Sequence, residues 1–135
     1  MIVMSTPSIT KAEKLHDDVV RIAAETLFKK NKVVMNIMGN RVASIDEVYP
    51  DLLVYDVYSV KPFMASDTPT AISEVVVEDE ITDELVSKWL SLKNLNVDRI
   101  VLILPEKTRS AANDALNDLG SKFELHFFDN DLHIS

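Results

Sequence analysis

The 135-residue chain contains no cysteine, so it can form neither a disulfide framework nor a thiolate metal site. This suits a reducing interior, and we expect a cytoplasmic protein. Only two glycines occur, Gly39 and Gly120, which excludes a glycine-rich phosphate loop. The apolar stretches are only a few residues long, so we expect no membrane-spanning segment, and residues 1–10 lack the basic region of a secretory signal.

The chain also lacks the excess of basic residues that duplex nucleic-acid binding normally requires, since its net charge is −8. Residues 1–68 hold 8 basic and 9 acidic side chains, whereas residues 69–135 hold 6 and 13. The charge therefore argues against a strong solitary DNA binder. It leaves room for a local basic patch around residues 29–41.

What the chain does contain is typical of one globular domain spanning residues 1–135, with 47% hydrophobic and 27% charged residues. Helical spacing of apolar residues predicts three helices, over residues 11–30, 82–93 and 108–119. Branched and aromatic runs predict strands over 32–38, 52–58, 71–77, 99–104 and 122–128, and a candidate returning strand over 42–48 after a tight turn at 38–41. Residues 1–9 and 129–135 are expected to be tails.

This order of elements predicts an α/β fold with a mixed central sheet of about five strands flanked by helices, α-β-β-β-α-β-α-β. The first strands can form a meander, and the later β–α–β–α–β order favours parallel neighbours. The intervening loop at 61–70 contains Phe63 and Met64, which we expect to be exposed and available to a partner.

Two acidic residues stand where such a sheet could bring them together. Asp51 opens the strand at 52–58, and Glu74 lies inside the otherwise apolar strand at 71–77. A buried carboxylate is costly unless it is paired or coordinates a metal. If the two strands pair, the carboxylates approach each other, and Mg²⁺ or Mn²⁺ would relieve their repulsion. The alternative is structural: Asp51 is then a turn residue after proline.

Segment 49–56 has the sequence YPDLLVYD, and segment 72–79 has the sequence ISEVVVED. Together with the leading helix, the meander and the crossover helix, they resemble the PD-(D/E)XK nuclease superfamily over roughly residues 11–105. The resemblance implies a restriction-endonuclease-like fold and cleavage of DNA or RNA. It also implies that Asp51 and Glu74 bind the metal ion, and that His16 is an accessory polar residue on the first helix.

The sequence departs from this family at Val76, where the pattern normally has a lysine that positions or activates the attacking water. Valine can do no acid–base work. Glu78, on the same strand face, or Lys88, on the following helix, could take over that role. The alternative for both Glu78 and Lys88 is that they are solvated surface side chains without a role in catalysis.

Three hypotheses therefore remain open. The first is a metal-dependent nuclease. The second is a catalytically inactive domain of the same fold that acts as a binding or assembly module, in the form of a homodimer. The third is an unrelated Rossmann-like or receiver-like domain, which would be revived if Asp51 and Glu74 lay on distant faces.

Overall fold

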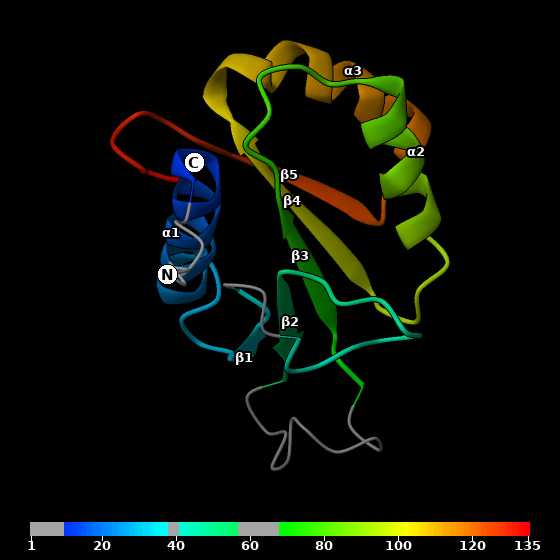
Figure 1. Ribbon diagram of the computed structural model, residues 1–135. Helices are drawn as coiled ribbons and strands as arrows, with labels where there is room; N and C mark the ends of the chain where they lie inside the picture. The colour runs from blue at the N-terminus through cyan, green and yellow to red at the C-terminus, as the bar shows by residue number, and fades with distance from the viewer. Residues whose placement is uncertain (1–9, 38–40, 57–67) are drawn as a thin grey trace, which may run out of the picture.

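The computed structural model describes residues 10–37, 41–56 and 68–135. Within these ranges the elements follow one another as the sequence predicts, with three helices, five strands and one short 3-10 helix (Figure 1). They are α1 (Lys11–Thr26), β1 (Lys32–Met35), β2 (Leu52–Tyr55), β3 (Ala71–Val75), α2 (Asp83–Leu92), β4 (Arg99–Pro105), η1 (Glu106–Thr108), α3 (Arg109–Leu119) and β5 (Phe123–Phe128). The expected α/β class and the expected number of strands are confirmed.

The five strands form one mixed sheet in the order β1-β2-β3-β4-β5. The first three strands pair antiparallel, as a meander, and β3, β4 and β5 run parallel. Helix α2 connects β3 to β4, and α3 connects β4 to β5, because parallel neighbours need a long crossover. Strand β3 is therefore the point at which the sheet changes from antiparallel to parallel pairing.

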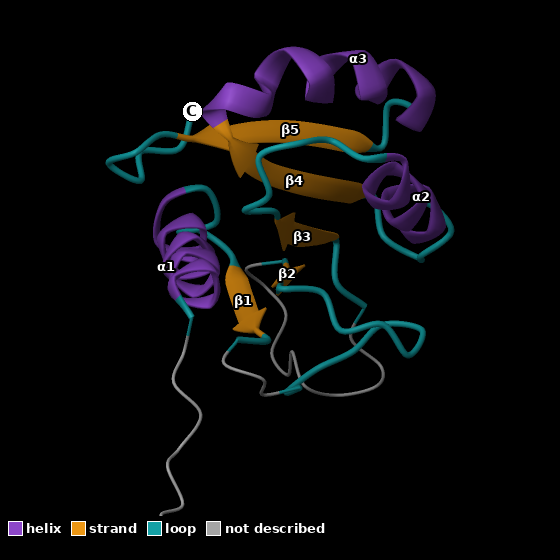
Figure 2. Ribbon diagram, turned by 45° about the horizontal axis from the view of Figure 1, so that its top comes forward, coloured by secondary structure: helices purple, strands orange, loops and turns teal. Residues whose placement is uncertain are grey.

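The helices cover both faces of the sheet (Figure 2). Alternate residues of β4 show the division, because successive side chains on a strand point to opposite faces. Val101 and Ile103 pack in a buried cluster with α1, while Ile100, Leu102 and Leu104 pack in a second cluster with α2 and α3. Both faces of the sheet are thus covered, which leaves the ends of the strands as the places where polar side chains can gather.

Side chains define where the helices begin and end. The hydroxyl of Thr10 accepts a hydrogen bond of 3.1 Å from the Glu13 amide, and that of Thr82 accepts one of 3.1 Å from the Leu85 amide. Each satisfies an amide that has no partner within its own helix. Gly120 ends α3 with a φ of 98°, a conformation that a residue with a Cβ atom rarely adopts.

The returning strand expected over residues 42–48 is wrong. An isolated bridge between Ile45 and Val48 is its sole β-pairing among the described residues, and β1 pairs with β2 instead. Asn36 explains the difference, because its side chain takes over the loop's backbone groups. The side-chain oxygen of Asn36 accepts hydrogen bonds from the backbone amides of Val42 and Ala43, and its side-chain nitrogen donates to the carbonyls of Ala43 and Pro50. Most of the expected turn at 38–41, and the Phe63/Met64 loop, lie outside the described residues.

The tail expected at 129–135 is also wrong, because this segment folds back on β5. The amide of Ser135 donates to the carbonyl of Phe127 at 2.8 Å, and the reverse bond measures 3.2 Å. Leu132 and Ile134 pack against the α1 side of the core, which supplies the apolar contacts that hold the segment in place. Its turn begins at Asp129, next to the carboxyl end of β5.

Within the described parts of the chain, no helix has the length and the apolar character that crossing a bilayer demands.

Candidate functional site

The antiparallel pairing of β2 with β3 places Asp51 next to Glu74. Leu52 pairs with Ser73, so Asp51 and Glu74 occupy the next opposing positions, one step beyond the ladder. Opposing residues on antiparallel strands project from the same face, with Cβ atoms about 5 Å apart. The backbone of Asp51 is also bound on the side of β1, because its carbonyl accepts a 3.0 Å hydrogen bond from the backbone amide of Asn36.

The carboxylate of Asp51 has two short contacts. Its Oδ2 accepts a 2.8 Å hydrogen bond from the Val75 amide and lies 3.0 Å from Nε2 of His16 on α1. The other ring nitrogen of His16, Nδ1, lies 3.0 Å from Oδ1 of Asp17. The hydrogen bond to Asp51 and its negative charge, supported by Asp17, raise the pKa of His16 to about 9 against the lowering effect of burial. At neutral pH His16 is therefore a cation between two aspartates.

Glu74 is buried, with 7% of its surface exposed. Burial disfavours the charged carboxylate, and together with the negative charge of Asp51 it raises the pKa of Glu74 well above its usual range. The positive charges of Lys88 and His16 act in the opposite direction but are outweighed. The site thus places a buried carboxyl group, whose proton is held more tightly than usual, beside the carboxyl group of Asp51 and the imidazole of His16.

The position of the missing lysine is filled with hydrocarbon. Val76 lies on the same face as Glu74, is 5% exposed, and packs in the buried cluster that contains Ile72 and Trp89. Of the two candidates for its role, Lys88 lies close enough for its charge to lower the pKa of Glu74, although it is otherwise exposed on α2.

Glu78 is not brought to this cluster. It lies beyond the end of β3, is exposed, and its Oε2 accepts a 3.1 Å hydrogen bond from the neighbouring Val77 amide. It is not among the groups whose charge acts on Glu74. The structure therefore groups four of the five candidate residues, namely His16, Asp51, Glu74 and Lys88, and leaves Glu78 outside.

One member of the cluster was missed from the sequence. Asp17 is buried, with 7% exposed, and holds His16 from the side opposite Asp51. A signal for it exists, because Asp17 lies three residues before Val20, so it falls within the stripe of α1 that faces the core. An acid in that stripe needs a partner, and His16 is its neighbour.

The carboxyl groups of Asp51 and Glu74 supply oxygen atoms, the ligands that hard divalent cations prefer. No group of three or more His, Cys, Asp or Glu side chains within residues 10–37, 41–56 and 68–135 is arranged to hold a metal ion. Two converging carboxylates are nevertheless a set that suits Mg²⁺, which keeps several waters and binds proteins through one or two carboxylates. A cation there would take the place of the proton on Glu74.

A scan against protein-family models finds no match for this chain. Searches of curated proteins and of solved structures find none either. The family resemblance of the sequence is thus neither supported nor opposed by these comparisons.

Proposed function

We propose that this protein is a nuclease-like enzyme that hydrolyses phosphodiester bonds of DNA or RNA with a divalent cation, Mg²⁺ or Mn²⁺, held by Asp51 and Glu74. The observation that carries the proposal is the convergence of these two carboxyl groups at one end of the β2/β3 pair. A buried acid beside a carboxylate is a costly arrangement that a divalent cation relieves.

The order of the elements supports the same proposal. The resemblance implies a leading helix, a three-stranded meander, a crossover helix and a parallel strand, and α1, β1–β3, α2 and β4 follow that order. A restriction-endonuclease-like fold is therefore our proposal for the finer architecture of this mixed sheet.

Each residue of the cluster has a defined part in the proposed chemistry. When bound, the cation lowers the pKa of a water and stabilises negative charge on the phosphate. Asp51 and Glu74 hold it through their oxygens. His16 fixes the rotamer of Asp51 through Nε2, with Asp17 fixing the ring in turn. Lys88 would take the role of the lysine that the family pattern has at position 76, which is to position or activate the attacking water.

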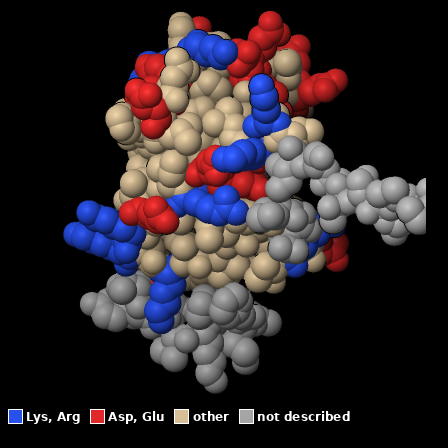
Figure 3. All heavy atoms as spheres, turned by 60° about the vertical axis from the view of Figure 1, so that its left-hand side comes forward, with Lys and Arg blue, Asp and Glu red and all other residues tan. Residues whose placement is uncertain are grey.

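The surface charge limits the way in which a nucleic acid could bind. On the face that carries α1, acidic and basic side chains are interspersed, with apolar and uncharged surface between them (Figure 3). With a net charge of −8, the chain would bind a polyanion weakly, so the bound cation itself would supply much of the attraction.

A cleavage assay with matched variants tests the proposal. Single-stranded, duplex and branched DNA and RNA are incubated with the protein in Mg²⁺ or Mn²⁺, and the products are resolved on gels. Asp51→Asn and Glu74→Gln should abolish cleavage, while Glu78→Gln, a nearby exposed acid, should leave it unchanged. Cleavage that survives Glu74→Gln would come from a contaminant, and the complete absence of cleavage would refute the proposal.

The role of Lys88 is tested separately. Lys88→Met keeps the length of the side chain and removes its charge, so cleavage should fall by about 10²–10⁴-fold, the usual effect of losing a proton-transfer group. Lys93→Met, at the end of the same helix, is the matched control. Equal activity of both variants would remove Lys88 from the mechanism.

The second candidate function is a catalytically inactive domain of the same fold that serves as a binding or assembly module, in the form of a homodimer. One observation favours it: His16 already neutralises Asp51 from within the chain, while Val76 is enclosed in the core. Calorimetric titration with Mn²⁺ separates the two candidates, since the inactive module need not bind the ion. Light scattering that shows a strict monomer would count against the assembly role.

A further inference from the structure

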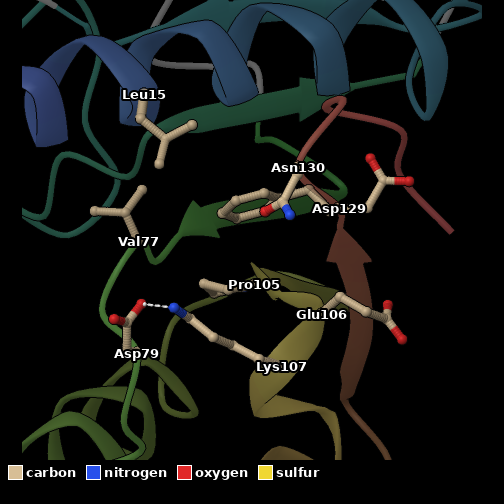
Figure 4. Close-up of a pocket in the computed structure, with 9 residues that line it drawn as sticks. Leu15, Val77, Asp79, Pro105, Glu106, Lys107, Asp129 and Asn130 are labelled. Atoms are coloured by element: carbon tan, nitrogen blue, oxygen red, sulfur yellow. Dashed lines mark ion pairs between the residues drawn. The ribbon is translucent and has the colours of Figure 1, made fainter.

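A cavity of about 500 Å³ opens at the carboxyl ends of the three parallel strands. Pro105 ends β4, Phe128 ends β5, and Val77 lies two residues beyond β3. Leu15 of α1 completes the apolar part of the wall, and Lys107 and Asn130 contribute polar groups (Figure 4). Open α/β sheets bind ligands in the crevice outside the carboxyl ends of their strands, and the volume lies within the range of small-molecule sites.

Residues that line the cavity are close in sequence to residues of the Asp51/Glu74 site. Leu15 directly precedes His16 on α1, and Val77 lies two residues after Val75, whose amide binds Asp51. Both sites also open at the same edge of the sheet. Strand β2 runs antiparallel to β3, so Asp51, at the start of β2, lies at the carboxyl end of β3. The cavity and the two carboxyl groups therefore lie at the same end of the parallel strands.

The acidic residues around the cavity are already paired. Asp79 forms a 2.7 Å ion pair with Lys107, and Glu106 is bound by both arms of the Arg109 guanidinium. The carboxylate of Asp129 accepts hydrogen bonds from two amides of its own turn. Figure 4 shows that Glu106 and Asp129 direct their carboxylates away from the cavity. The interior thus presents an apolar, nearly neutral surface, which suits an uncharged ring.

Asn130 adds specific polar recognition to this surface. It lies in the exposed turn after β5, and its side-chain amide makes no hydrogen bond with another residue of the described ranges. A primary amide offers one acceptor and two donor hydrogens. Asparagine pairs in this way with the edge of a nucleobase, while apolar and aromatic walls pack against its faces.

We propose that this cavity binds one unpaired nucleobase of the substrate strand, with a phosphate of the same strand at the Asp51/Glu74 site. The inference rests on the proposed function and narrows it. A base inside a duplex is stacked and cannot enter a cavity unless it leaves the helix. The substrate class is therefore single-stranded nucleic acid, or a strand with a frayed or branched end, rather than intact duplex.

Binding of nucleotides without metal tests the cavity directly. Nitrogen-15-labelled protein in EDTA is titrated with each of the four ribonucleoside 5′-monophosphates and, as the control, with inorganic phosphate. The amide signals of Val77 and Asn130 should shift with at least one nucleotide and stay in place with phosphate. The inference is overturned if no nucleotide shifts them at millimolar concentration, or if phosphate shifts them equally.

A matched pair of variants tests the recognition by Asn130. Asn130→Ala removes an exposed side chain that holds no other part of the fold, and it should weaken nucleotide binding by about tenfold, the effect of losing one or two hydrogen bonds. Asn117→Ala, at an exposed position on α3, should change nothing. Equal affinity of the two variants would overturn the assignment of Asn130.

The outcomes for the cavity and for the proposed function can be told apart. If the protein binds nucleotides in EDTA but cleaves no substrate, the nuclease proposal fails and the base site stands. If it cleaves duplex and single strands equally, and Asn130→Ala alters neither rate, the base site fails and the nuclease proposal stands.

Discussion

Replacing Glu74 with glutamine should make the fold less sensitive to rising pH. In the folded chain the carboxyl group holds its proton more tightly, because burial and the charge of Asp51 raise its pKa well above the usual range. In the unfolded chain it ionises near the ordinary glutamate pKa of about 4.3. Between these two pKa values the folded state binds one more proton than the unfolded state, so the free energy of unfolding falls as pH rises. Glutamine has no proton to lose.

The size of the effect follows from the single proton. A difference of one bound proton changes the free energy of unfolding by about 1.4 kcal/mol per pH unit. His16 contributes little to the pH dependence of stability between about pH 5 and pH 6. Its pKa is raised to about 9 in the folded chain, so in that pH range it is protonated in both the folded and the unfolded state. Over that one unit, the stability of Glu74→Gln relative to the natural chain should therefore rise, and the effect of one proton is the upper limit of that rise.

Urea unfolding followed by the fluorescence of Trp89, the single tryptophan, measures this difference at both pH values. Titrating groups outside this cluster are common to the two proteins, so their contributions cancel in the comparison. Glu78→Gln is the matched control, and its difference from the natural chain should be the same at both pH values, since Glu78 is exposed. If the Glu74→Gln difference also stays constant, Glu74 ionises alike in both states and the reasoning fails.

Three further predictions follow from the described contacts. The His16 ring should titrate near pH 9 by NMR, and in Asp51→Asn the pKa of His16 should move toward 6.5; an unshifted midpoint would contradict the pairing. The contribution of this pair to the stability of the fold is complete below about pH 6.5 and is lost as pH rises toward 9. Mn²⁺ binding should weaken on the order of tenfold per pH unit on acidification, because the ion displaces the Glu74 proton, and calorimetry that finds a constant affinity would argue against that site. Arg99→Ala should lower stability by no more than ~1 kcal/mol in thermal unfolding, because its bidentate pair with Glu124 is exposed; a much larger loss would mean that Arg99 has a packing role.

The parts of this structure that the sequence predicts are those governed by local chemistry. The helical spacing of apolar residues in α1 and α2 and the apolar run of β4 are each visible within a few residues of sequence. The opposition of Asp51 and Glu74 depends on one further step, the pairing of two strands. That step could be inferred because both strands are short, apolar and joined by a single connection.

The parts that could not be predicted depend on partners far away in the chain. Residues 42–48 have the apolar content of a strand, but Asn36 binds their backbone, and nothing in the local pattern shows that competition. The polar segment 129–135 is held by Ile134 and Leu132 against a core that exists only in the folded chain. The cavity at the strand ends is likewise assembled from four separate regions, so no motif announces it.

The fold-back of the last residues has a consequence for how a ligand would enter and leave. The turn that carries Asn130 forms one wall of the cavity. Backbone hydrogen bonds between Phe127 and Ser135 hold the two ends of this turn together. So few backbone bonds open at far less free energy than the central strands, which separate only when the whole domain unfolds. We therefore expect this wall to open by local unfolding while the rest of the molecule stays folded. Its amides should exchange with deuterium long before those of β4.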